Sequence, residues 1–194
     1  MNAASRLMAG IGLSIAVALV MPGRLLGHRT PADDAGPARP ATDLTRAQAD
    51  ELVRAHNVWR KKTGVFPLRW AADLAASSKT RAEYLAAHGC YIEHGLLPED
   101  VGENLYRSSP LRADGRPDAF NPVTPTQVVD AWGSESAYYA ASSDTCVPGR
   151  QCGHYTQVVW PSTEQIGCGM SVCPTMGQVW VCRYRPRGNV RIIR

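Results

Sequence analysis

Two histidines and two glutamates beyond residue 90 have the side-chain types that bind a divalent metal or transfer protons. They are His94, Glu103, Glu135 and His154. Neutral imidazole suits zinc, and a neighbouring carboxylate can orient a water or accept a proton. Spacing alone does not unite the four, because no HExxH-like run is present. Taken one at a time, each residue also has a non-functional interpretation. His94 could be an ordinary loop histidine, Glu103 an acid at a helix N-terminus, and Glu135 a buried, hydrogen-bonded carboxylate.

His154 stands at the start of a segment whose composition is that of a strand. The run Cys152-Gly153-His154-Tyr155-Thr156-Gln157-Val158-Val159-Trp160 alternates β-branched and aromatic residues with polar ones, which is typical of a half-buried strand. We therefore predict a strand over 154–160. The end of a strand often carries a functional group, because the strand fixes the side chain while the loop leaves it accessible. On composition alone, a structural histidine is the simpler interpretation.

Two helices are predicted near the start of the domain. The first covers 46–63, is capped by Asp43 or Thr45 and is ended by Gly64. The second covers 71–88 and carries small residues at helical spacing. That stripe permits close approach by another layer, so we interpret it as core.

The middle of the domain, 89–123, is rich in Gly and Pro, and we expect loops there. A third helix is predicted to begin at Thr124-Pro125-Thr126-Gln127, with Thr as the N-cap, Pro at the first helical position and Gln at the capping-box position. Glu135 then falls on the face of this helix that packs inward.

Two further strands are predicted at 165–173 and 178–184. The residues Pro174-Thr175-Met176-Gly177 between them make the pair a hairpin. Folding the hairpin back brings Cys168 within one residue of Cys182. The hairpin therefore predicts a cross-strand disulfide.

An even number of cysteines behind an export signal indicates three disulfides in an oxidising compartment. The six are Cys90, Cys146, Cys152, Cys168, Cys173 and Cys182. A zinc site is the alternative, but no two of them have the spacing CxxC. Cys146 and Cys152 can close a small loop, and by elimination Cys90 pairs with Cys173.

The N-terminal part of the chain is predicted to lie outside the folded domain. Residues 1–27 have a positive start at Arg6 and an apolar run without a clear cleavage site, as in a signal peptide or an uncleaved signal anchor. Residues 28–42 are a Pro/Ala-rich linker, which leaves 43–194 as one domain. We expect a secreted, extracellular or periplasmic protein, or a membrane-anchored one if the signal is retained.

The charge balance excludes a nucleic-acid-binding surface. The formal net charge is +4. Four arginines and two aspartates precede residue 43, so the domain alone carries about +2. Only a mild attraction to anionic lipid or cell-wall polymers follows, and we expect a monomer.

Motifs spread over the whole of 43–194 resemble the CAP superfamily, which comprises cysteine-rich secretory proteins, venom antigen-five and plant group-one pathogenesis-related proteins. The run Cys152–Trp160 is the most specific, and the six cysteines match the plant type. The other motifs stand in family order: Ala55-His56-Asn57-x-x-Arg60, Val65-x-Pro67-Leu68-x-Trp70, Leu74-Ala75, Cys90-x-x-x-His94, Gly102-Glu103-Asn104-Leu105, Trp132-x-x-Glu135-x-x-x-Tyr139, Gly167-Cys168 and Cys182-x-Tyr184-x-Pro186-x-Gly188-Asn189.

The resemblance implies an α+β fold: a disulfide-stabilised, three-layer α-β-α sandwich with a small antiparallel sheet. It implies the pairs Cys90–Cys173, Cys146–Cys152 and Cys168–Cys182. It also implies that His94, Glu103, Glu135 and His154 line one cleft, in which the two histidines hold Zn²⁺ or another divalent cation. The connection from His94 to Glu103 is longer than in the plant proteins, which bears on the placement of His94. We interpret the matched His56, Asn57 and Arg60 as structural.

Three functions are compatible with this pattern. The first is a non-enzymatic binding or effector module for a sterol, a fatty acid, a membrane or another cell-surface ligand. The second is a metal-assisted hydrolase with Glu103 or Glu135 as general base, although no nucleophile or oxyanion hole is evident. The third is a purely structural role for the four residues, whose burial would be costly unless they were paired or bound to a metal.

Overall fold

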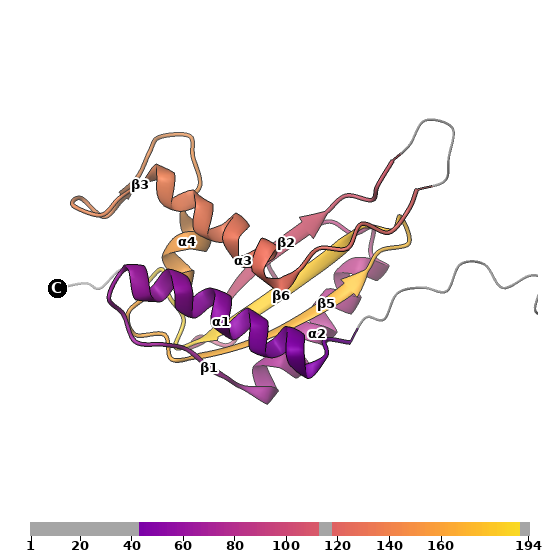
Figure 1. Ribbon diagram of the computed structural model, residues 1–194, viewed down its shortest axis with the longest axis horizontal. Helices are drawn as coiled ribbons and strands as arrows, with labels where there is room; N and C mark the ends of the chain where they lie inside the picture. Colours follow the sequence, from indigo (N-terminus) through magenta and orange to yellow (C-terminus); the bar gives the residue numbers. More distant parts are fainter. Residues whose placement is uncertain (1–42, 113–117, 191–194) are drawn as a thin grey trace, which may run out of the picture. The chain divides into compact units, whose positions relative to one another are not determined.

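A four-stranded sheet forms the middle layer of the computed structural model, which describes residues 43–112 and 118–190 (Figure 1). Its strand order is β1-β5-β6-β2. β5 and β6 form the antiparallel hairpin, β2 is antiparallel to β6, and β1 is parallel to β5. The strands are β1 (Arg69–Trp70), β2 (Gly102–Ser108), β5 (Gln165–Val172) and β6 (Gln178–Arg185). A separate two-stranded hairpin pairs β3 (Tyr139–Ala140) with β4 (Thr145–Cys146).

Helices cover both faces of the sheet, as expected for an α-β-α sandwich (Figure 1). α2 (Ala72–Ala87) packs against β5 and β6 on one face. The other face carries α1 (Arg46–Lys62) and α3 (Pro125–Gly133), which pack on each other. A 3-10 helix, η1 (Ser134–Tyr138), continues α3, and the short α4 (Gly153–Val158) packs beside them. The predicted fold class is confirmed.

Alternate residues of β6 face opposite helical layers, so the domain has two apolar cores. Trp180 and Tyr184 join Leu52 of α1 and Trp132 of α3 in the larger core. Val179 joins the smaller core with residues of α2 and the Cys90–Cys173 pair. Such alternation is what a period of two along a strand requires.

α2 approaches the sheet closely, as its stripe of small residues predicts. Gly167 and Gly169 face this helix from β5. A Cβ atom at Gly167 would overlap the backbone of Ala71, Leu74 and Ala75. Ser78, which is fully buried, donates to the Gly167 carbonyl at 2.8 Å. Glycines on the strand and small residues on the helix together permit this contact.

The predicted strand over 154–160 is wrong: residues 153–158 form the helix α4. The first-turn N–H groups of His154 and Tyr155 both donate to the Glu135 carboxylate, at 2.9 and 3.2 Å. This carboxylate lies 19 residues earlier in the chain and caps the helix from outside. Tertiary capping therefore overrides a composition that favours a strand.

The expected loop over 89–123 is also partly wrong, because β2 lies inside it. This strand pairs with β6 from Gly102↔Tyr184 to Ser108↔Gln178. Its sequence lacks the run of β-branched residues that marks a strand, so the signal lies in its partner. Consequently Glu103 stands on a strand, and the interpretation of this residue as an acid at a helix N-terminus is wrong.

The helix predictions hold to within a residue or two at each end. Thr45 caps α1 and Thr124 caps α3, each in a capping box, and Pro125 stands at the start of α3. Gly64 follows α1 with a φ of 73°, a conformation that glycine adopts without strain. Glu135 does lie on the continuation of α3, in η1 rather than in the helix itself.

Three disulfides connect Cys90–Cys173, Cys146–Cys152 and Cys168–Cys182. Cys168 and Cys182 face each other directly in the β5–β6 register, one residue closer than the hairpin prediction requires. The signal segment 1–27 and the linker 28–42 lie outside the described residues. Within 43–112 and 118–190, no helix is long and apolar enough to cross a membrane.

Candidate functional site

A cavity of about 280 Å³ contains three of the four predicted site residues. Residues from β2, α4 and the segments near them form its wall: His94, Glu103, Asn104, Gln151, Gly153, His154 and Asn189. Glu135 does not line the cavity, but its carboxylate hydrogen-bonds to the ring of His154, which does. The structure therefore brings together residues that lie far apart in the sequence.

Glu103 joins His94, which also lines the cavity, to Arg183 on the neighbouring strand. Its Oε1 atom accepts from His94 Nδ1 at 3.1 Å, and its Oε2 atom accepts from Arg183 Nε at 3.2 Å. The carboxylate is fully buried, whereas the His94 side chain is 61% exposed. Register fixes the carboxylate–guanidinium contact, since Glu103 and Arg183 are partners in the β2–β6 ladder. The ion pair with Arg183 offsets part of the cost of burying this carboxylate.

The hydrogen bond with Glu103 raises the pKa of His94 above its ordinary 6.5. Burial of the ring and the charge of Arg81 act in the opposite direction. Because the pKa is raised in the folded state, this pair stabilises the fold fully below pH 6.5. The contribution is lost as the pH rises through the folded pKa, and solvent screens it, since the ring is largely exposed.

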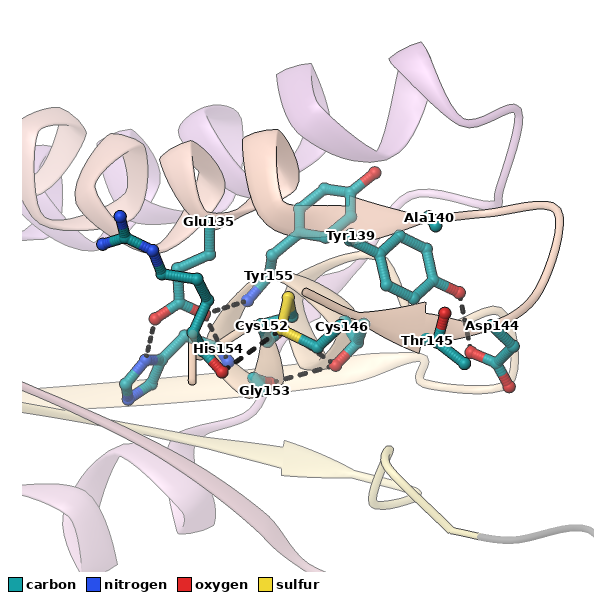
Figure 2. The surroundings of a disulfide bond; sticks show 12 residues. Glu135, Tyr139, Ala140, Asp144, Thr145, Cys146, Cys152, Gly153, His154 and Tyr155 are labelled. Carbon is teal, nitrogen blue, oxygen red and sulfur yellow. Dashed lines mark hydrogen bonds and ion pairs between the residues drawn. A yellow bond between two sulfur atoms is a disulfide. The ribbon is translucent and has the colours of Figure 1, made fainter. Parts of the chain in front are cut away.

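Glu135 holds His154 in the same manner (Figure 2). Its Oε1 atom accepts from His154 Nδ1 at 2.7 Å, while Oε2 accepts the two backbone N–H groups at the start of α4. The His154 ring also stacks on Trp132, with ring centroids 6.3 Å apart. The Glu135 side chain thus fixes both the His154 ring and the N-terminus of α4.

A chain of buried hydrogen bonds supports the cavity from the core. Burial lowers the pKa of His56 to about 4, so its ring is neutral. Its Nδ1 donates to the Leu52 carbonyl at 2.7 Å, and its Nε2 therefore accepts from the Tyr184 hydroxyl at 2.9 Å. The amide of Asn104 donates to that hydroxyl and to the His154 carbonyl. The structural role predicted for His56 fits these contacts.

Sequence reasoning missed four residues of the site. Asn104 and Asn189 line the cavity, as does Gln151, and Arg183 binds Glu103. Asn104 and Asn189 occur in motifs of the sequence, but amide side chains are common in loops and give no signal of a cavity. Arg183 could be assigned only once β2 had been paired with β6.

In both His94 and His154, Nδ1 donates a hydrogen bond to a glutamate carboxylate. When the ring is neutral, Nε2 therefore carries the lone pair that could bind a metal. Within the two described ranges, neither Nε2 atom has a recorded hydrogen-bond partner. The same ranges contain no cluster of three or more His, Cys, Asp and Glu side chains suited to a metal. The protein therefore offers two nitrogen donors, each oriented by a carboxylate.

Comparison with known proteins places this arrangement in a family. The model of the cysteine-rich secretory protein (CAP) family matches residues 53–184. The chain belongs to this family. Pathogenesis-related protein 1A of Nicotiana tabacum is 39% identical over 141 residues, which cover 73% of this chain and 76% of the tobacco protein.

Solved structures of the CAP family share the fold at lower identity. Venom allergen-like protein 4 of Schistosoma mansoni has a TM-score of 0.57 and 22% identity, over 75% of this chain and 92% of its own. NaASP2 with Zn²⁺ also has a TM-score of 0.57, at 20% identity, over 79% of this chain and 86% of its own. This CAP domain is thus similar in sequence to a pathogenesis-related protein and has the fold of these solved structures.

Proposed function

We propose that this CAP domain is a non-enzymatic binding module whose cavity holds a divalent cation, Zn²⁺ or a similar ion, between His94 and His154. The observation that carries the proposal is that each imidazole is anchored through Nδ1 by a carboxylate. Such carboxylate–histidine pairs fix the ring and raise the basicity of the free nitrogen in metal sites. Two nitrogen donors are fewer than the three protein ligands of a typical open zinc site, so water or a bound ligand would supply the remaining positions.

The two carboxylates support binding over hydrolysis. A metal-assisted hydrolase needs a carboxylate that takes a proton from water, and hydrogen bonds donated to a carboxylate make it a weaker base. Both oxygens of Glu103 are occupied, by His94 and Arg183, and both oxygens of Glu135 are occupied, by the His154 ring and two backbone N–H groups. No serine, threonine or cysteine is among the seven residues that line the cavity. The hydrolase therefore stays the weaker alternative.

Family membership supports a small ligand or a cell-surface partner for the module. The classes that we propose are those implied by the sequence resemblance: a sterol, a fatty acid or another membrane component. Zinc bound to NaASP2, a relative in fold, supports the cation. Secretion, which the family description names, is part of the same proposal. Sterol and fatty-acid binding by the oxidised protein, with and without Zn²⁺, tests the ligand class, and no binding in either state contradicts it.

Calorimetric titration of the oxidised protein with Zn²⁺ tests the cation. We expect one site per chain, lost in His94→Ala and in His154→Ala, and weakened about tenfold or more in Glu135→Gln. His88→Ala is the matched control, because His88 is exposed and stacks on Tyr84. The affinity should fall as the pH is lowered through the raised pKa of His94, since protons compete for its ring.

A purely structural role for the four residues predicts a different result. His94→Ala would then lower stability and leave Zn²⁺ binding and ligand binding as in the parent protein. Thermal unfolding of each variant, measured beside the titrations, separates the two explanations. Zinc binding by the parent that survives both histidine substitutions would contradict the proposed site.

A further inference from the structure

A second cavity, of about 520 Å³, lies between the end of α1, the β3–β4 hairpin and the segment that follows α4. It shares no residue with the His/Glu cavity. Its volume is in the range of small-molecule sites, roughly 300–1,000 Å³. The four residues of the proposed zinc site do not line it, so its ligand is a separate question.

Aromatic rings form much of this second cavity. Tyr139 and Tyr155 lie with ring centroids 5.6 Å apart and a tilt of 60°, and Trp160 adds a third ring. Figure 2 shows Tyr139 and Tyr155 beside the β3–β4 hairpin. Tyr139 and Trp160 are half-buried, so part of each side chain is open to a ligand, whereas Tyr155 is only 9% exposed. Aromatic faces attract cations through the quadrupole of the ring.

Asp144 is the one residue with a charged side chain among those that line the cavity. Its Oδ1 atom accepts from the Tyr139 hydroxyl at 2.7 Å (Figure 2), and this bond raises the pKa of Tyr139. Within the described residues its Oδ2 atom has no recorded hydrogen bond. Asp144 is exposed and has a φ of 51°, a left-handed conformation that aspartate adopts more readily than most residues.

Two neighbouring rings already hold a cation of the chain itself. Lys62 Nζ lies 3.6 Å from the ring centre of Trp59, and the Arg150 guanidinium lies 4.8 Å from that of Tyr138. Over the part of the chain that is described, no such contact is recorded for the three rings of the cavity. One of them, Tyr139, hydrogen-bonds to a carboxylate instead. Ring faces and a carboxylate without an internal cation match a ligand that brings its own positive charge.

We propose that this second cavity binds a free, small organic cation, a quaternary or alkylated ammonium group on a short apolar body. Asp144 supplies the counter-charge, and the rings of Tyr139 and Trp160 supply the faces against which the cation packs, with Tyr155 packed against Tyr139. This proposal does not depend on the zinc site.

Choline and its uncharged isostere 3,3-dimethylbutan-1-ol test the proposal on the oxidised protein by NMR. We expect choline to shift the Asp144 and Tyr155 amides and the Trp160 indole saturably, with a dissociation constant of about a millimolar, as suits so small a ligand. The isostere, which lacks the charge, should bind about five- to tenfold more weakly or not at all.

Asp144→Asn is the decisive variant. Asparagine keeps the shape, tolerates the left-handed conformation and still accepts from Tyr139. We expect choline to bind at least about fivefold more weakly to it. Asp50→Asn, which changes an exposed aspartate of α1, should bind choline like the parent. His94→Ala should also keep choline binding, so that failure of the zinc site and failure of this one are distinguishable.

Several results would overturn the inference. They are no shift with choline, equal affinity for choline and its isostere, unchanged affinity in Asp144→Asn, and shifts centred on His94 and His154. Association with phosphatidylcholine vesicles without binding of free choline would also overturn the inference, because the partner would then be a lipid surface and not a free cation.

Discussion

Replacing Arg60 with methionine should lower the free energy of unfolding by about 4 kcal/mol, the scale expected when several buried carbonyls lose a charged hydrogen-bond donor. Arg60 is completely buried in α1. Its guanidinium donates to the carbonyls of Phe66, Val158, Trp160 and Thr163 at 2.6 to 3.0 Å. Methionine leaves the carbonyls of Phe66, Val158 and Thr163 without this donor, whereas that of Trp160 still accepts from the Thr163 N–H at 3.2 Å. Each unsatisfied buried group costs about 1–3 kcal/mol before relaxation.

The charge of Arg60 is held by carbonyl dipoles, since no carboxylate of the described residues pairs with it. Burial lowers its pKa to about 10, so it stays protonated at neutral pH. Three of its four acceptors lie at the end of α4 and just beyond it. Loss of Arg60 should therefore also disturb the helix that carries His154.

Urea unfolding under oxidising conditions measures this effect. Arg54→Met is the matched control, because Arg54 is an exposed arginine of the same helix; it should change stability by less than about 0.5 kcal/mol. Similar losses in the two variants would contradict the account of Arg60.

Removal of the Cys90–Cys173 disulfide by paired alanine substitutions should cost about 4.5 kcal/mol in the chain-entropy model. The pair closes a loop of sequence separation 83 and joins the end of α2 to the end of β5. Long loops gain most from closure, because the unfolded chain loses the most freedom.

The Cys168–Cys182 pair is a control of matched burial. Its cysteines are as buried as Cys90 and Cys173, but its sequence separation is only 14. The same substitutions there should cost about 3 kcal/mol. Denaturant unfolding of both double variants measures the difference, which isolates loop length. Equal losses would show that packing of the cystine, and not closure of the loop, sets its contribution.

Elements whose signals lie within a few residues could be predicted from the sequence. The cap at Thr124 is an example: Thr, Pro and Gln within four residues complete the start of α3, and the structure has both hydrogen bonds of the capping box. The β5–β6 hairpin is another, because the loop between two apolar strands fixes the register that opposes Cys168 to Cys182.

Elements stabilised by distant residues could not be predicted. α4 has the composition of a strand, and a helix forms there because Glu135 caps its first turn. β2 lacks a strand composition of its own and forms by pairing with β6. The candidate site was predictable only in part for the same reason. Its histidines and glutamates could be identified from the sequence, but the Glu103–Arg183 contact depends on the pairing of β2 with β6.

The most direct test of the central claim is NMR of the imidazole nitrogens in the oxidised protein, at a pH above the pKa of His94. Without metal, we expect both rings to carry their proton on Nδ1, where each carboxylate accepts it. One equivalent of Zn²⁺ should then shift the Nε2 resonances of His94 and His154 together, with His56 and His88 unchanged. Protons on Nε2 in the metal-free protein, or a shift at only one of the two rings, would contradict a shared site.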